Sequence, residues 1–158
     1  MAFTLSNRSL GKLEGVHPLL VAVVKTAVQN TRIDFGVIYG VRTLEEQQEL
    51  FDKGVSKTMK SNHLIQDDGY SHAVDLMAYV GSRPSWEVSL YDDLADAVKI
   101  AAKEHGAHVR WGGAWTVDDI RLWEGTMEEA MNSYIDLRRS QGRRPFFDGP
   151  HFELRSLA

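Results

Sequence analysis

Histidine and aspartate side chains recur in three short segments of the sequence, and together they could bind one metal ion. The segments are Ser61-Asn62-His63, His72-Ala73-Val74-Asp75 and Asp148-Gly149-Pro150-His151. Two histidines and one aspartate would leave the fourth position of a tetrahedral zinc ion open, as in catalytic zinc sites. Structural zinc sites are usually closed by cysteines, and this chain has none. The pattern therefore predicts a catalytic metal site.

The last segment also contains a carboxylate that need not be a metal ligand. Asp148 and His151 are three residues apart, and a turn leading into a strand could direct His151 at the metal and hold Asp148 just outside its ligand shell. There Asp148 could take a proton from a metal-activated water. Glu153 would share the strand face of His151, because side chains alternate along a strand, and it could orient the imidazole ring.

Helices and short strands must position these segments. Apolar residues at helical spacing, together with capping signals, predict four helices: after His17-Pro18, after Thr43, over residues 86–105 and after Thr126. Strands are expected where β-branched and aromatic residues dominate: 33–40, 73–80, 107–111 and 151–154. Residues 1–16 and 55–71 are expected to be irregular. Helices that interleave with short strands favour an α+β fold, in which helices pack on a small, mainly antiparallel sheet.

The composition is that of one globular domain over residues 1–158. Its 43% of hydrophobic residues can form a core, and 25% of charged residues is typical of a globular protein. The formal net charge of −4 argues against a dedicated nucleic-acid-binding protein. No segment has the pattern of a signal peptide or the length of a membrane span, so no integral membrane segment is expected.

The order of the motifs resembles a family of zinc peptidases that includes D-alanyl-D-alanine carboxypeptidases and phage L-alanyl-D-glutamate endopeptidases. The family pattern is Ser-x-His, then Ala-x-Asp, and later an acidic residue, two spacers and His. Residues 61–63, 73–75 and 148–151 match it in order. Gly40-Val41-Arg42-Thr43 resembles a Gly-Tyr-Arg-Thr segment of the family, and Arg110-Trp111-Gly112-Gly113 resembles its Trp-Gly-Gly segment.

This resemblance implies a role for each matched residue. His63, Asp75 and His151 would be the zinc ligands, and Asp148 would be the catalytic base. Arg42 would steady the developing oxyanion or the substrate carbonyl. The implied fold is that of the zinc D-Ala-D-Ala carboxypeptidases and hedgehog-like proteins.

The sequence departs from the family pattern at two places, and the first leaves the choice of one ligand open. The stretch between His63 and Asp75 is longer than usual, so His72 competes with His63 as a ligand. Ala114 follows the Trp-Gly-Gly segment, where relatives often have an aspartate, so no carboxylate can act there.

Four arginines follow one another near the end of the last predicted helix: Arg138, Arg139, Arg143 and Arg144. Favourable interaction with the helix dipole explains most of such a cluster. Attraction to an anionic cell wall or membrane is the alternative.

The resemblance therefore implies a phage endolysin that hydrolyses the L-Ala-D-Glu bond of the murein stem peptide during host lysis. The alternatives are a D-alanyl-D-alanine carboxypeptidase, a non-catalytic murein-binding protein of the same fold, and a metal nuclease, against which the acidic balance argues. The expected partner is the peptidoglycan stem peptide, with no nucleic acid. We expect a monomer without a separate cell-wall-binding domain. It would be made in the host cytoplasm and reach the periplasmic cell wall after a holin-type pore opens.

Overall fold

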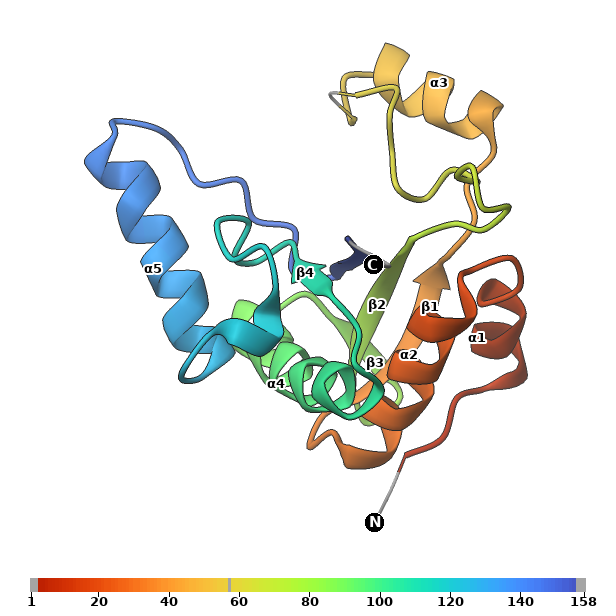
Figure 1. Ribbon diagram of the computed structural model, residues 1–158, viewed down its shortest axis with the longest axis horizontal. Helices are drawn as coiled ribbons and strands as arrows, with labels where there is room; N and C mark the ends of the chain where they lie inside the picture. Colours follow the sequence, from red (N-terminus) through yellow and green to blue (C-terminus); the bar gives the residue numbers. More distant parts are fainter. Residues whose placement is uncertain (1–2, 57, 156–158) are drawn as a thin grey trace.

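An antiparallel sheet forms the centre of the structure (Figure 1). The computed structural model describes residues 3–56 and 58–155. The sheet has five strands, ordered β1 (Asp34–Tyr39), β2 (Ala73–Val80), β5 (His151–Leu154) and β4 (Val109–Trp111), with β3 (Arg83–Ser85) pairing with β2. Every pairing is antiparallel, which confirms the predicted α+β class.

Helices pack around this sheet. They are α1 (Asn7–Lys12), α2 (Pro18–Asn30), α3 (Leu44–Asp52), α4 (Val88–His105) and α5 (Met127–Ser140), with a short 3-10 helix η1 (Ile120–Leu122). The long helix α4 contacts β2 and β4 and also packs against α2 and α5. In Figure 1, α3 stands apart from the other helices, beyond the end of β1. In the described residues, no helix has the length and apolar character needed to cross a membrane.

The helix ends predicted from the sequence coincide with capping interactions in the structure. Thr43 and Thr126 each form the predicted capping box, with Glu46 and Glu129 respectively. Helix α4 ends at Gly106, whose backbone is left-handed with φ 65°, a conformation that glycine adopts without a steric cost. The four predicted helices are therefore present, although α4 begins two residues later than expected.

Several elements differ from the prediction. Residues 1–16, expected to be irregular, contain α1, and neither β3 nor η1 was expected. Strand β4 begins at Val109 rather than at residue 107. Leu137 of α5 is 44% exposed, and the buried residues of that helix all lie at or before Tyr134. The second half of α5 thus extends beyond the core.

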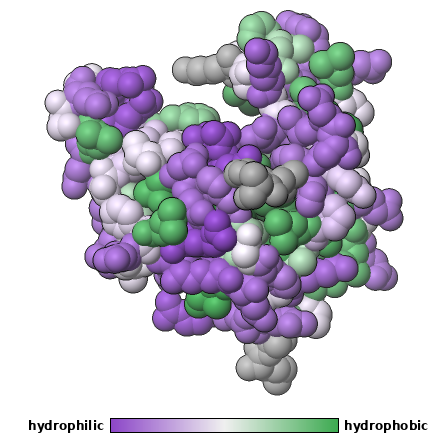
Figure 2. Space-filling model, in the orientation of Figure 1, coloured by the Kyte–Doolittle hydropathy of each residue, from purple (hydrophilic) through white to green (hydrophobic). Residues whose placement is uncertain are grey.

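Helix α3 contributes little to the core, although its sequence carries several apolar residues. Leu44 is 65% exposed and Phe51 43% exposed, whereas the polar Gln47 is fully buried. Figure 2 shows apolar side chains on the surface in this part of the molecule, within a surface that is mainly hydrophilic. The buried face of α3 therefore makes a polar contact through Gln47, which is described below.

One face of β2 packs in the hydrophobic core, and the other carries Asp75. Val74, Leu76 and Ala78 are completely buried and belong to the hydrophobic core. Asp75 points to the opposite face, because side chains alternate along a strand. Asp75 pairs directly with His151 of β5 in the sheet register. Residues that are paired directly project from the same face, so the sheet itself brings this carboxylate and this imidazole together.

Candidate metal centre

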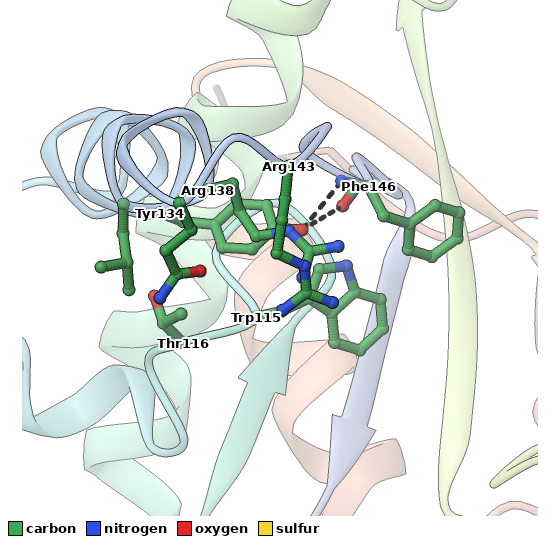
Figure 3. Close-up of a pocket in the computed structure, with 8 residues that line it drawn as sticks. Trp115, Thr116, Tyr134, Arg138, Arg143 and Phe146 are labelled. Atoms are coloured by element: carbon green, nitrogen blue, oxygen red, sulfur yellow. Dashed lines mark hydrogen bonds between the residues drawn. The ribbon is translucent and has the colours of Figure 1, made fainter.

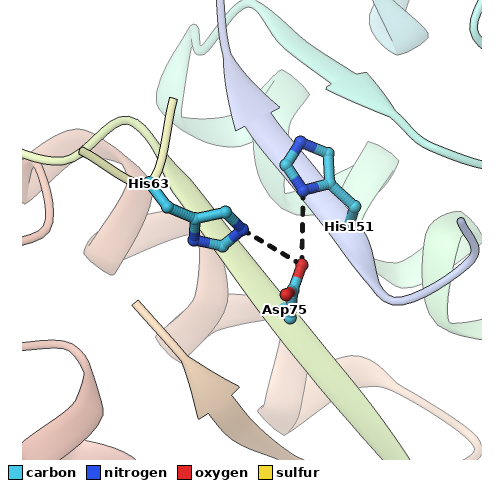
Figure 4. Close-up of side chains that lie close together, drawn as sticks. All are labelled: His63, Asp75 and His151. Carbon is cyan, nitrogen blue, oxygen red and sulfur yellow. Dashed lines mark hydrogen bonds and ion pairs between the residues drawn. The ribbon is translucent and has the colours of Figure 1, made fainter. Parts of the chain in front are cut away.

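His63, Asp75 and His151 meet at the start of β2 (Figure 4). The Oδ1 atom of Asp75 lies 3.3 Å from Nε2 of His63 and 3.2 Å from Nδ1 of His151. One candidate ligand atom from each residue lies within 4.8 Å of the other two. Around a tetrahedral zinc with bonds of about 2.1 Å, neighbouring ligand atoms would be about 3.4 Å apart. The cluster could therefore bind a metal ion, and it comprises the three residues that the resemblance implies as ligands.

The outward nitrogen of each imidazole is occupied by a hydrogen bond. Nδ1 of His63 lies 2.8 Å from the carbonyl oxygen of Gly40, which can only accept, so Nδ1 carries the proton and Nε2 is free to bind a metal. Nε2 of His151 lies 2.8 Å from Oε1 of Glu153, which leaves Nδ1 facing Asp75. Partners of this kind fix the orientation of metal-binding histidines.

Glu153 lies where the sequence placed it, on the same face of β5 as His151. It is 4% exposed, and its Oε2 accepts ion pairs at 3.3 Å from Arg110 and from Arg155. Burial raises the pKa of Glu153, but His151 and the two arginines outweigh that effect and hold the pKa below its usual value. A carboxylate that stays ionised is suited to orient the imidazole.

His63 is held in place by the backbone around it. Its carbonyl oxygen accepts a hydrogen bond from the Arg42 backbone N–H at 2.9 Å. Its own backbone N–H donates to the hydroxyl of Ser61 at 3.2 Å. The serine of the Ser-x-His motif therefore shapes the turn that presents the histidine.

His72, the competing ligand, is directed elsewhere. Its Nε2 lies 2.7 Å from Oδ2 of Asp68, and its ring contacts that of His17 edge-on, with centroids 5.5 Å apart. The lengthened loop between His63 and Asp75 supplies Asp68 as its partner. His72 is not part of the three-residue cluster. The geometry therefore favours His63 over His72.

The Trp-Gly-Gly segment supports the turn that carries Asp148 and His151. The indole N–H of Trp111 donates to the carbonyl oxygen of Gly149 at 2.7 Å. The backbone of Gly112 bonds both ends of the turn, accepting from Asp148 at 2.9 Å and donating to His151 at 2.8 Å. A side chain at Gly112 would place its Cβ 2.2 Å from the carbonyl oxygen of Asp148, so only glycine fits here.

Asp148 lies beside the cluster, not within it. Burial raises the pKa of its carboxyl group, the nearby charge of Asp75 raises it further, and His151, His63 and Arg42 act in the opposite direction. The net pKa is above the usual value for aspartate. A raised pKa brings a carboxylate closer to the range in which it can both accept and return a proton.

Arg42 is anchored by a buried glutamine. Its Nη1 donates to Oε1 of Gln47 at 2.8 Å and lies 3.4 Å from the hydroxyl of Ser61. The amide nitrogen of Gln47 donates to the hydroxyl of Ser56 and to the carbonyl oxygen of Thr58. Gln47 thus joins the guanidinium to the loop after α3, which explains why a polar residue occupies the inward face of that helix.

Arg42→Lys is expected to lower kcat by about 10-fold or more while zinc content is unchanged. An ammonium cannot reproduce the planar guanidinium fork that bonds Gln47. Turnover and metal content of the purified variant would be measured beside Arg32→Lys, a control in which the arginine is exposed and pairs with Asp93. Wild-type turnover in Arg42→Lys would reduce Arg42 to a structural residue.

Metal affinity is expected to depend strongly on pH. Burial lowers the pKa of His151, but its hydrogen bonds to Asp75 and Glu153 raise it to about 9. A metal bound at Nδ1 must displace a proton from that nitrogen, so below this pKa the affinity should increase about 10-fold per pH unit and level off above it. Zinc titration against a competing chelator at several pH values would measure the slope. A flat profile would contradict ligation by His151.

A matched variant would show that the slope belongs to the cluster. His105 hydrogen-bonds Thr26 at the contact between α4 and α2. His105→Gln should leave the pH dependence of zinc affinity unchanged.

Comparison with known proteins places this arrangement in a family. A model of the family described as phage L-alanyl-D-glutamate peptidase matches residues 1–155. The L-alanyl-D-glutamate peptidase of Escherichia phage T5 is 26% identical over 158 residues, which cover 98% of this chain and 99% of that protein.

A solved structure supports the same assignment. The crystal structure of the L-Ala D-Glu endopeptidase ChiX from Serratia marcescens superimposes with a TM-score of 0.70. The two chains are 33% identical, and the match covers 98% of this chain and 90% of ChiX. The match to the family model covers nearly the whole chain, and the fold and the sequence identity agree with it. The chain belongs to the phage L-alanyl-D-glutamate peptidase family.

Proposed function

We propose that the protein is a zinc-dependent endopeptidase, a phage endolysin that hydrolyses the L-Ala-D-Glu bond of the peptidoglycan stem peptide. One observation carries the proposal: His63, Asp75 and His151 converge on one point with Asp148 beside them. Three ligands leave a coordination position for chemistry. The T5 peptidase and ChiX, both named for the L-Ala-D-Glu bond, support this substrate.

The donor set suits zinc. Two imidazole nitrogens and one carboxylate oxygen are ligands that zinc accepts readily in the absence of thiolates. His63 would bind through Nε2, His151 through Nδ1 and Asp75 through its carboxylate, since these atoms face one another. When bound, zinc would lower the pKa of a coordinated water and polarise the scissile carbonyl group.

The remaining residues would handle protons and charge. Asp148 takes the proton of the attacking water and later returns it to the leaving amine. Arg42, fixed by Gln47, faces the negative charge that develops on the carbonyl oxygen. Glu153 holds the ring of His151 in place.

The family also supports a place of action. A phage peptidase with a peptidoglycan substrate would be made in the host cytoplasm. It would reach the periplasmic wall once a holin-type pore has permeabilised the membrane.

Digestion of purified murein tests the proposed function. The protein should contain about one zinc per chain, lose activity on chelation and regain it when zinc is restored. Mass spectrometry of the fragments should show peptides that begin with D-Glu. Release of free D-alanine alone would identify a D-alanyl-D-alanine carboxypeptidase instead. Intact murein would leave the non-catalytic alternative, and chelator-resistant cleavage would exclude the zinc mechanism.

A further inference from the structure

An open pocket of about 380 Å³ lies beside the metal centre, between α5 and the segment that follows β4 (Figure 3). Its wall is formed by Trp115, Tyr134 and Phe146, with the guanidinium groups of Arg138 and Arg143 at its side. None of these residues has a part in the metal chemistry described above.

The pocket shares a wall with the metal centre. The ring of Trp115 lies 5.5 Å from the ring of His151, centroid to centroid. Phe146, two residues before Asp148 in the sequence, stacks on Trp115, with the ring centroids 6.0 Å apart. A ligand that lies against Trp115 would therefore lie next to the proposed reacting groups.

Hydrogen bonds and a cation–π contact hold the lining residues of the pocket in place. The hydroxyl of Tyr134 accepts a hydrogen bond from the backbone N–H of Phe146 at 2.8 Å and donates to its carbonyl oxygen at 3.1 Å. The side chain of Arg138 lies over the ring of Tyr134 and donates from Nε to the carbonyl oxygen of Arg144 at 3.2 Å. These contacts hold the aromatic wall and one guanidinium in fixed positions.

The positive charge of this pocket is not balanced by carboxylates in the described part of the chain. There, the arginines that form ion pairs with carboxylates are Arg32, Arg110, Arg121 and Arg155. Arg138 lies in the last turn of α5, where the helix dipole accounts for a positive charge. Arg143 lies beyond the end of that helix, so the dipole does not explain why it lines the pocket.

We propose that this pocket binds a carboxylate of the stem peptide on the carboxyl side of the scissile bond. The inference rests on the proposed function. A glutamate joined to the chain through one of its carboxyl groups has a second one, and an acidic segment therefore follows the bond. Guanidinium groups recognise carboxylates through paired, charge-assisted hydrogen bonds. The aromatic wall would pack against the aliphatic part of the same segment.

A paired set of substrates tests the proposal. Stem peptides with free carboxylates on the carboxyl side of the bond would be compared with peptides in which each carboxylate is converted in turn to a neutral amide. For the wild type, amidation of the carboxylate bound in the pocket should raise KM by about 10-fold with little change in kcat. In the variant carrying both Arg138→Gln and Arg143→Gln, the charged peptide should already have the higher KM, and amidation should add nothing. Full discrimination in this variant would overturn the proposal.

Two further variants separate an effect of the pocket from effects on folding or on overall charge. Arg143→Gln alone removes a guanidinium without disturbing the bond from Arg138 to Arg144, and it should show part of the rise in KM. Arg139→Gln changes an exposed arginine of the same helix that does not line the pocket, and it should behave as the wild type. An equal rise in KM for Arg139→Gln would show a general charge effect and contradict the pocket.

Binding measured without turnover separates this inference from the proposed function. In an Asp148→Asn background, calorimetric titration with the free stem peptide should give a dissociation constant about 10-fold weaker when both pocket arginines are replaced. If murein is not cut at L-Ala-D-Glu but this binding difference persists, the proposed function fails and the pocket stands. If murein is cut there and both arginines are without effect on binding, the pocket proposal fails alone.

Discussion

Asp148→Asn is expected to keep its zinc and to lose activity by about 10²- to 10⁴-fold in kcat, the usual contribution of general acid–base catalysis. The amide is nearly the same size as the carboxylate, so the turn held by Trp111 and Gly112 should persist. An amide cannot accept a proton from water and return it at neutral pH. The raised pKa of Asp148 indicates that the carboxylate already lies in an environment suited to proton transfer.

Metal analysis and steady-state kinetics on the same preparation would test this separation. Asp136→Asn, at an exposed position of α5, is the matched control and should have wild-type kinetics. Loss of zinc from Asp148→Asn would mean that Asp148 is a ligand. Unchanged kcat would mean that another group is the base, and Glu153 would be the next candidate.

His63→Ala is expected to lose the metal and to lose activity by more than about 10³-fold, whereas His72→Ala should retain both. His63 is 2% exposed, and its Nε2 faces the shared oxygen of Asp75. Alanine there removes one of the three proposed ligands. His72 instead pairs with Asp68, so its loss should cost at most about 1 kcal/mol of stability, as for other partly exposed ion pairs.

Zinc content after dialysis, followed by murein digestion, would distinguish the two variants. Thermal unfolding would show whether either variant fails to fold. If His72→Ala lost the metal and His63→Ala kept it, the ligand assignment would be reversed.

The parts of the fold that the sequence predicted correctly are those with strong local signals. Helix α2 has a proline at its first position, α3 and α5 have capping boxes, and α4 ends at a glycine. The short elements α1, β3 and η1 lack enough residues for a hydrophobic period to emerge. Helix α1 in particular depends on a tertiary contact, since the hydroxyl of Ser9 accepts a hydrogen bond from the backbone of Val37 in β1.

The members of the candidate site and the contact of Glu153 with His151 were predictable, but the other supporting contacts were not. The resemblance of the motifs to the zinc peptidase family implied His63, Asp75, His151 and Asp148, and the structure places them together. Sequence order could not decide between His63 and His72, because that depends on the partner towards which each ring turns. Nor could sequence spacing reveal that the Trp-Gly-Gly segment supports the turn at residues 148–151, since the contact from Trp111 to Gly149 spans 38 residues.

The direct pairing of Asp75 with His151 links the proposed chemistry to the accuracy of folding. A slip of one residue between β2 and β5 would turn His151 to the opposite face of the sheet and move Glu153 with it. Phe152, which belongs to the hydrophobic core in the native register, would then point to the face that carries Asp75. A sheet assembled out of register would therefore lose its core packing and its metal ligand in the same error. Activity thus acts as a check on correct assembly, and no partly active misfolded form of the enzyme is expected.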